Sequence, residues 1–406
     1  MKSLRGILNT TVIVSALGYF VDIYDLLLFS IVRVASLKDL GVPEEQLLNQ
    51  GVHLLNMQMF GMLIGGILWG VLGDKKGRLS VLFGSIFLYS LANIANAFVH
   101  SVESYAALRL IAGIGLAGEL GAAITLVSEV LPQKTRGYGT SLVAGIGILG
   151  AVAAAIIGDV FHWRTAYLIG GGLGLVLLIM RISMFESGMY KSLKESKVKK
   201  GDLFLLLKTG SRISRYLSCI FVGIPIWFVI GILITLSPEL SKAIGVTEPV
   251  VAGKSVLFAY IGLSFGDIAS GFLSQLLKSR KKILFSFILF TFALILVYLF
   301  SSGFSAEQFY FLCGLLGFGT GYWAVMITVA SEQFGTNLRA TVTTTVPNFI
   351  RGAVVPITLS FQALKSTFSL PIAALIVGSV CVFLALVSIF YLEESYHRNL
   401  DFLERD

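Results

Sequence analysis

Long apolar stretches separated by short polar or glycine-containing turns make up nearly the whole chain. The hydrocarbon core of a bilayer, about 30 Å thick, is crossed by roughly 20 residues of α-helix, and these stretches have that length. A transmembrane β-barrel would instead show alternating segments of about ten residues. The pattern therefore predicts an all-α membrane protein with twelve transmembrane helices, at residues 8–32, 53–73, 79–98, 103–131, 138–159, 164–184, 214–237, 252–276, 283–301, 306–331, 340–363 and 370–392.

Composition supports this class of protein. The 406 residues are 56% hydrophobic and only 13% charged, which excludes a soluble globular domain. The first apolar run carries two aspartates and lacks a small-residue cleavage pattern, so we expect it to be retained as a membrane span. Cys219, Cys313 and Cys381 each lie alone in apolar sequence, which indicates neither a disulfide framework nor a metal site. We expect no cofactor and no metal.

Basic residues predict the orientation in the membrane. Most of the 31 Lys and Arg residues lie at the N-terminus, in the even-numbered connections or in the C-terminal tail, which places both termini in the cytoplasm. This bias accounts for the net charge of +8, so no nucleic-acid partner is expected. The basic segment 185–213 is predicted to be a cytoplasmic linker between a bundle at 1–184 and a bundle with its tail at 214–406.

The two halves of the chain share sequence features. SEVLPQKTRG (128–137) follows the fourth span and SEQFGTNLRA (331–340) follows the tenth. GVLGDKKGR (70–78) and GFLSQLLKSRKK (271–282) each follow the second span of their half. Such a repeat predicts two parallel, pseudo-symmetric six-helix bundles.

Three of these motifs resemble the major facilitator superfamily. The turn between spans two and three is similar to its Gly-x-x-x-Asp-basic-x-Gly-basic signature, RLIAGIGLAGE (109–119) to its span-four pattern, and HWRTAY (162–167) to its usual start of span six. The resemblance implies the two-bundle fold and transport by alternating access. The C-terminal copy of the turn has Gln275 where the signature has its acid. The signature positions are Gly70, Asp74, Gly77 and Arg78.

The resemblance assigns a gating role to residues at helix ends. The carboxylate of Asp74 can meet the positive end of a neighbouring helix in one conformation and release it in another. A plain positive-inside turn is the alternative reading of the same residues. Two further pairs, predicted to latch helices together, are Glu129 with Arg136 and Glu332 with Arg339.

Ionisable residues inside predicted spans are candidates for proton coupling, because each costs about 2.5–3.5 kcal/mol at a helix centre. Asp22 and Asp25 share one face of span one, while Arg109 and Glu119 lie in span four. Asp25 with Arg109 resembles the pair of proton-coupled sugar porters, and Glu119 resembles the acidic site of phosphate:proton symporters. Alternatives are a static Asp25–Arg109 pair, a capping or hydrating role for Asp22, and a fixed hydrogen bond for Glu119.

Arg351, at the middle of span eleven, indicates the substrate class. An embedded guanidinium that cannot neutralise itself is well compensated by a carboxylate or phosphate. Pairing with Asp267 or with a carbonyl group is the alternative. Six further residues are candidates for substrate binding: Asn348, Tyr19, Trp227, Tyr260, Tyr322 and Trp323. The alternative for the aromatic residues is that their rings only pack against neighbouring helices.

Within the superfamily the chain resembles metabolite:proton symporters, through VDIYDLLLFS, GELGAAITLVSEVLPQKTRGYG and LEESYHRNLDFLE. The predicted function is proton-coupled uptake of a small organic anion by a monomer in the bacterial cytoplasmic membrane. Alternatives are proton-coupled efflux of amphipathic compounds, although span five lacks the proline typical of drug antiporters, and transport of an organic cation or phosphate. The four histidines lie far apart and no Walker-type loop is present, so no enzyme is predicted.

Overall fold

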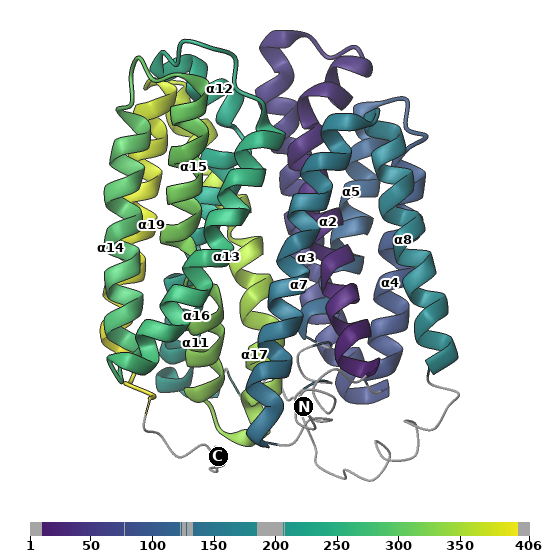
Figure 1. Cartoon of the computed structure of the whole chain (residues 1–406), viewed down its shortest axis with the longest axis vertical. Helices are drawn as coiled ribbons and strands as arrows, with labels where there is room; N and C mark the ends of the chain where they lie inside the picture. The colour runs from purple at the N-terminus through teal and green to yellow at the C-terminus, as the bar shows by residue number, and fades with distance from the viewer. Residues whose placement is uncertain are drawn as a thin grey trace. The chain divides into compact units, whose positions relative to one another are not determined.

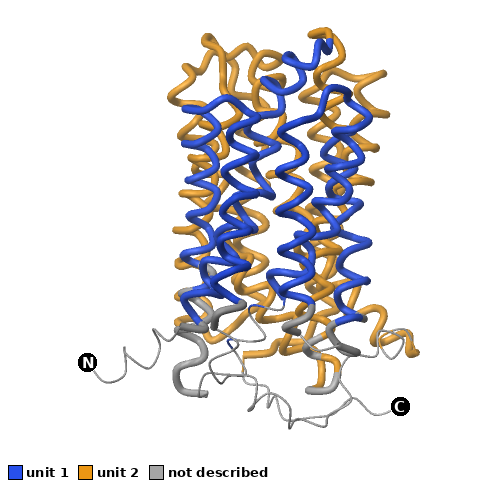
Figure 2. The backbone as a smooth tube through the Cα atoms, turned by 90° about the vertical axis from the view of Figure 1, so that its right-hand side faces the viewer, with its two compact units in different colours: residues 1–42, 53–201 blue, residues 43–52, 202–406 orange. Residues whose placement is uncertain are grey.

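The computed structural model describes residues 10–76, 78–121, 123, 127, 133–184, 206 and 208–396. Regular structure in this part of the chain is helical throughout. Contacts divide the chain into two compact units (Figure 2). Unit 1 comprises Met1–Val42 and His53–Gly201, and unit 2 comprises Pro43–Val52 and Asp202–Asp406. The start of the second long helix thus groups with the C-terminal half, which the linear division of the sequence did not anticipate.

The helices of unit 1 lie side by side along the long axis of the chain (Figure 1). Helix α2 packs extensively on α7, and α4 packs on both α5 and α8. Ser101 caps the start of α5 by accepting a hydrogen bond from the Ser104 amide at 3.2 Å. The long helices are α2 (Thr10–Asp39), α3 (Leu47–Lys76), α4 (Arg78–Asn96), α5 (Val102–Leu116), α7 (Gln133–Val160) and α8 (Trp163–Met184).

Unit 2 contains more helical pieces because several of its spans are interrupted. Helix α11 continues into the π-helical segment η3 (Val229–Ile234), and the tenth span breaks at Gly321 and Tyr322 between α15 and α16. Its helices are α11 (Gly210–Phe228), α12 (Ser237–Ile244), α13 (Ala252–Leu276), α14 (Arg280–Leu299), α15 (Ala306–Thr320), α16 (Trp323–Glu332), α17 (Thr336–Gly352), α18 (Val354–Lys365) and α19 (Leu370–Tyr391).

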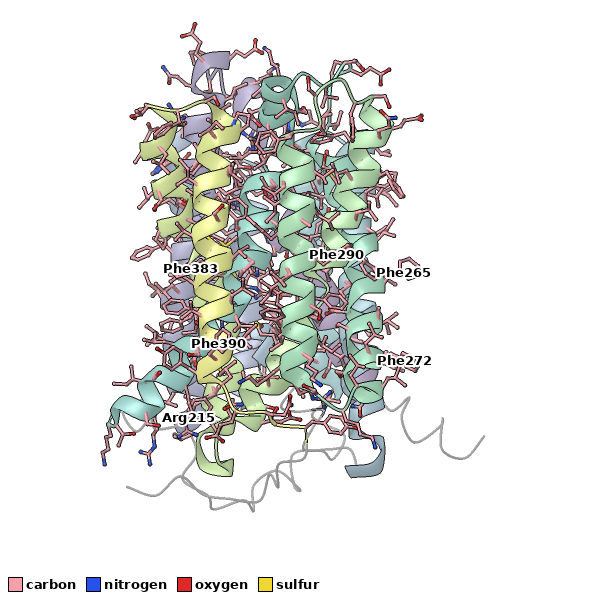
Figure 3. All side chains as sticks on the ribbon, turned by 90° about the vertical axis from the view of Figure 1, so that its left-hand side faces the viewer. Arg215, Phe265, Phe272, Phe290, Phe383 and Phe390 are labelled. Atoms are coloured by element: carbon pink, nitrogen blue, oxygen red, sulfur yellow. The ribbon has the colours of Figure 1, made fainter. Side chains whose placement is uncertain are left out.

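Eight helices in the described residues are long and apolar enough to cross a membrane, and two shorter apolar helices cover Val81–Asn96 and Gly145–Val160. The fourth predicted span turns at Ala117 and Gly118, and the eleventh divides at Ala353, so neither forms one uninterrupted apolar helix. Phenylalanines project outward from α13, α14 and α19 (Figure 3). Phe265, Phe272 and Phe390 are 64%, 67% and 76% exposed, which suits a surface bathed in lipid.

Glycines bring the second and fourth spans of each half into backbone contact. A Cβ atom added to Gly61 or Gly65 of α3 would collide with the carbonyl oxygens of Leu110 and Ile114 on α5. The corresponding contacts of unit 2 join α13 to α15, where a Cβ atom at Gly262 or Gly266 would collide with the carbonyl oxygens of Gly314 and Phe318. The repeat detected in the sequence therefore extends to helix packing, and small residues permit the close approach.

This packing makes a testable distinction between two glycines of α13. Gly262→Ala is expected to lower the thermal unfolding temperature of the detergent-purified protein, because the new methyl group would overlap the backbone of α15. Gly271→Ala meets open space and is expected to leave stability unchanged or raise it by about 0.5–1 kcal/mol through helix propensity. Equal unfolding temperatures for the two variants would contradict the close contact.

Candidate functional site

One face of α2 carries the aspartates predicted for proton coupling. Gly18, Asp22 and Asp25 are spaced by four and three residues and therefore share a face of the helix. Both aspartates are fully buried. Gly170 on α8 faces the carboxylate of Asp25 and the ring of Tyr24, because a Cβ atom there would collide with both. The absence of a side chain at Gly170 is what gives Asp25 its room.

Arg109 on α5 lies in the same buried cluster. Its Nη2 donates a hydrogen bond to Asn93 Oδ1 at 2.6 Å, and its guanidinium lies 4.8 Å from the Tyr167 ring centroid. The hydroxyl groups of Tyr105 and Tyr167 are hydrogen bonded to each other at 2.6 Å. These contacts fix the position of the guanidinium. Asn93 is one of two asparagines, with Asn96, in the predicted span 79–98, and it was not among the predicted site residues although its position inside a span was a signal.

Asp25 and Arg109 interact through space. Arg109 acts electrostatically on the Asp25 carboxylate, and Asn93 faces that carboxylate as well. No hydrogen bond reaches either Asp25 oxygen, or the Nε and Nη1 atoms of Arg109, from the described residues. The structure thus brings the predicted partners together without locking them in a static ion pair. Polar atoms buried in this way are costly and commonly belong to functional sites.

Glu119 has a partner that sequence reasoning missed. Arg181, near the end of α8, donates hydrogen bonds to both carboxylate oxygens, one of them over 3.1 Å between Nη1 and Oε2. The side chains are 3% and 0% exposed. Arg181 lies near the end of the predicted span 164–184, and no role was predicted for it from the sequence. The fixed-pair alternative for Glu119 therefore describes the observed arrangement, and Gly18 of α2 provides the space for it.

Arg351 on α17 is the centre of a second cluster, which lies within unit 2. It is 1% exposed, and its guanidinium lies 5.8 Å from the Trp227 ring and 6.0 Å from the Trp323 ring. Its Nε and Nη1 atoms have no hydrogen-bond partner among the described residues. The structure therefore brings together three of the predicted substrate residues, one each from α11, α16 and α17.

Asp267 does not neutralise this arginine. Its Oδ1 accepts a hydrogen bond from the Ala324 amide at 3.1 Å, and the Trp323 amide also bonds to the carboxylate. Asp267 thus caps the free amides at the start of α16. The close approach of Gly266 to Gly321 makes this reach possible. The alternative prediction, an ion pair between Arg351 and Asp267, is therefore not observed in the described residues.

The remaining predicted substrate residues occupy separate places. Tyr322 is fully buried and donates to the Val222 carbonyl at 3.1 Å, while Asn348 donates to the Thr344 carbonyl at 3.1 Å. Tyr260 is buried on α13 and is not one of the rings that Arg351 faces in the described residues. Tyr19 belongs to unit 1, where its ring packs against Gly147 of α7.

Few of the predicted gating groups fall on described side chains. Gly70 is half-buried within α3. Glu332 pairs with Arg280 of α14 at 3.6 Å and accepts a hydrogen bond from Ser395 Oγ at 2.6 Å. Its predicted partner Arg339 lies outside the described side chains, as do the other gating groups, namely Asp74, Gly77, Arg78, Glu129 and Arg136.

The segment that follows α19 contacts the same end of unit 2. Glu394 accepts hydrogen bonds from Ser279 Oγ and from the backbone amides of Arg280 at 2.9 Å and Lys281 at 3.2 Å. Burial raises the pKa of Glu394, but these hydrogen bonds outweigh it and hold the pKa below its usual value. Gln275, at the position of the missing signature acid, accepts from the Tyr396 hydroxyl at 3.0 Å. The tail thus supplies acidic groups to the C-terminal copy of the turn.

The buried Arg181–Glu119 pair predicts a stability difference. Arg181→Met leaves Glu119 as a buried charge without that partner and is expected to cost roughly 3–5 kcal/mol in the free energy of unfolding. Arg181→Met combined with Glu119→Gln is expected to recover much of this loss. Asp39→Asn, in the exposed Arg164–Asp39 pair, serves as control and is expected to cost about 0–1 kcal/mol. Thermal unfolding measures all three, and an unchanged Arg181→Met protein would contradict the pair.

Known transporters resemble this chain over most of its length. A protein of Haemophilus influenzae whose name describes metabolite transport is 28% identical over 95% of this chain and 96% of its own. The 3-(3-hydroxy-phenyl)propionate transporter of Escherichia coli is 29% identical over 70% of each chain. The 4-hydroxybenzoate transporter PcaK of Acinetobacter baylyi is 27% identical over 80% of this chain and 65% of its own.

A solved structure and a family model agree with these relatives. The crystal structure of a D-xylose-proton symporter superposes with a TM-score of 0.70 over 95% of this chain and 98% of its own, at 17% sequence identity, and so shares the fold. The predicted twelve-helix, two-bundle fold is thereby confirmed, as is the prediction of a membrane transporter rather than an enzyme. The model of the Major Facilitator Superfamily matches residues 15–358, and the chain belongs to that superfamily.

Proposed function

We propose that this transporter takes up a small organic anion together with a proton, and that a planar aromatic carboxylate is the preferred substrate. The observation that carries the proposal is the Arg351 cluster of unit 2. The Arg351 guanidinium is buried, and its Nε and Nη1 donors have no hydrogen-bond partner among the described residues. A substrate carboxylate can accept short charge-assisted hydrogen bonds from these donors. Mid-membrane burial strengthens that attraction, because water does not compete for the same donors.

The two tryptophans give the site its preference for a flat ring. Trp227 and Trp323 come from different helices and both face the guanidinium, so an aromatic substrate bound to Arg351 would meet indole surfaces. Aromatic pairs gain about 0.5–1.5 kcal/mol beyond the burial of their area. The relatives support this choice, since 4-hydroxybenzoate and 3-(3-hydroxy-phenyl)propionate each join a carboxylate to an aromatic ring.

Asp25 is the strongest candidate for the group that carries the proton. Its carboxylate is fully buried beside Arg109 and Asn93, and unlike Glu119 it forms no two-nitrogen pair with an arginine of the described residues. Such a group can gain or lose a proton without breaking a bidentate bond. Glu119, which the sequence also favoured, has both oxygens bound by Arg181. We therefore assign the first proton-binding step to Asp25 with Asp22 beside it.

The mechanism is alternating access. With the substrate path open outward, Asp25 takes a proton and Arg351 takes the anion, so that proton and anion together reduce the charge left in the occluded protein. The halves then rearrange and both are released inside. We place the protein in a bacterial cytoplasmic membrane with both termini in the cytoplasm, acting as a monomer. A cationic substrate is disfavoured, because Arg351 would repel it.

Arg351 variants test the anion site. Arg351→Ala is expected to weaken the binding of benzoate and nicotinate by about 10- to 100-fold, the equivalent of losing charge-assisted hydrogen bonds worth roughly 1.5–3 kcal/mol. Ligand-induced thermal stabilisation of the purified protein measures the binding. Lys242→Ala removes an exposed positive charge from the same unit and is expected to bind as the unmodified protein does. Undiminished binding by Arg351→Ala would refute the anion site.

Asp25→Asn tests proton coupling in proteoliposomes. The amide cannot carry the proton, so accumulation of benzoate or nicotinate driven by an inward proton gradient is expected to be lost. Exchange of labelled for unlabelled substrate needs no net proton movement and is expected to continue. Normal accumulation by Asp25→Asn would remove this residue from the coupling step, and a requirement for sodium in the unmodified protein would contradict proton symport altogether.

A further inference from the structure

Tyr89 of α4 is a buried phenol that the proposed site does not use. The side chain is fully buried, and its hydroxyl has no hydrogen-bond partner among the described residues. Leaving a buried hydroxyl unsatisfied costs about 1–3 kcal/mol. A phenylalanine would fill the same space without that cost. The hydroxyl is therefore retained at a disadvantage to stability, which calls for a functional reason.

The surroundings of Tyr89 are set by glycines on two helices. Gly115 on α5 touches its backbone, and Gly174 on α8 faces its ring, where an added Cβ atom would lie 3.2 Å from Cε2. The charged groups that act on the Tyr89 hydroxyl are Glu119, Asp25, Asp22 and Arg181. They come from three different helical segments and include all the buried acids that the sequence analysis named in unit 1.

These groups form a row inside unit 1. On α2, Gly18 contacts the Arg181–Glu119 pair, and Asp25 lies seven residues further along, or about 10 Å, on the same face. On α8, which contacts α2, Gly170 faces Asp25, Gly174 faces Ser90 and the edge of the Tyr89 ring, and Arg181 binds Glu119. Positions 170, 174 and 181 share one face of α8. The order along α8 therefore places Tyr89 between the aspartates and the Arg181–Glu119 pair.

We propose that Tyr89 relays the proton between the Asp22–Asp25 carboxyl groups and Glu119, so that the row is the proton path through the N-terminal bundle. The inference deepens the proposed function and rests on it. Along this route Tyr89 transfers the proton. Glu119 receives it at the end of unit 1 where α2 begins and α8 ends.

The transfer leaves no charged phenol in the membrane. The O–H bond of the aspartic acid breaks as its proton bonds to the Tyr89 oxygen, and the original phenolic O–H bond breaks as that proton bonds to a Glu119 oxygen. The aspartate becomes ionised, Glu119 becomes a carboxylic acid, and tyrosine remains neutral. Arg181 gives up one hydrogen bond to the receiving oxygen and regains it when Glu119 passes the proton to water.

Arg181 has a positioning role in this scheme. Its guanidinium holds both oxygens of Glu119 in place between α2 and α8, so the acceptor keeps a defined position relative to the row. Helix α5 ends at Leu116, and the fourth span is interrupted at Ala117 and Gly118, directly before Glu119. The interruption gives Glu119 its place at the end of the row.

Tyr89→Phe is the decisive variant, because a relay and a structural role predict opposite results. As a relay, the hydroxyl is needed for proton movement, so proton uptake accompanying benzoate or nicotinate entry into proteoliposomes is expected to fall at least about tenfold. Exchange of labelled for unlabelled substrate is expected to stay within about threefold of the unmodified protein. The unfolding temperature is expected to be unchanged or higher, since an unsatisfied hydroxyl has been removed.

Tyr298→Phe is the matched control. Tyr298 is an equally buried tyrosine in unit 2, and its hydroxyl donates to the Leu233 carbonyl at 2.7 Å. Losing that hydrogen bond is expected to lower the unfolding temperature while the ratio of protons to substrate stays the same. A purely structural Tyr89 would behave as Tyr298 does.

The outcomes separate the relay from the proposed function. If the unmodified protein couples proton and substrate entry and Tyr89→Phe does so equally well, the relay alone is overturned. If the unmodified protein moves either probe without protons, both proposals fall.

If it moves neither probe, the aromatic-carboxylate proposal falls, and the relay is decided without substrate by infrared spectra of the purified protein at acid pH. The relay requires that a carboxyl group, once protonated, forms a hydrogen bond with the Tyr89 hydroxyl, and such a bond lowers the carbonyl frequency. Tyr89→Phe must therefore shift the band that Asp25→Asn or Glu119→Gln removes, and an unshifted band overturns the relay.

Discussion

The cost of holding charged side chains away from water is the constraint on which the rest of this structure depends. An ion inside a helical bundle loses its hydration and must be compensated by a partner of opposite charge or by hydrogen bonds. In unit 1, Arg181 binds Glu119 through two nitrogens, and Arg109 is held by Asn93 and by tyrosine rings. In unit 2, tryptophans flank Arg351 in place of an acid. The proposed division of work, with protons in one bundle and the anion in the other, follows from this difference.

Glycine is what allows the helices to bring these groups together. Gly18, Gly170 and Gly174 leave room for the Glu119 pair, for Asp25 and for the Tyr89 ring. The repeated glycine contacts between α3 and α5 and between α13 and α15 place backbone against backbone at the level of the broken fourth and tenth spans. A side chain at the glycines of α3 or α13 would meet the backbone of the facing helix and force the two helices apart, whereas at Gly18 or Gly170 it would displace the side chains of the charged groups. The interrupted spans then offer amide groups or acids, as Asp267 and the start of α16 illustrate.

The two pairs of opposite charge inside unit 1 differ in how easily they can rearrange. Glu119 and Arg181 form a saturated pair whose opening exposes two charges at once, whereas Asp25 and Arg109 interact without a hydrogen bond between them. Groups of the second kind respond to the entry of a proton or an anion at little structural cost. At the far end of unit 2, Glu332 and Glu394 join the tail to α14, so an acid absent from the repeated turn is supplied from another part of the chain.

The sequence by itself determined the fold class, the repeat of the two halves and the embedded residues Asp22, Asp25, Arg109, Glu119 and Arg351, because the length of an apolar run and the charge within it are local properties. Only the tertiary structure decided which of these groups are partners. Arg181 lies 62 residues from Glu119 and Asn93 lies 16 from Arg109, while the unused hydroxyl of Tyr89 becomes visible only once three helices surround it. The physical reason is that a membrane helix is apolar on nearly every side, so its sequence says little about which face turns inward. Glycine contacts between helices set that rotation, and with it the pairing of the buried charges.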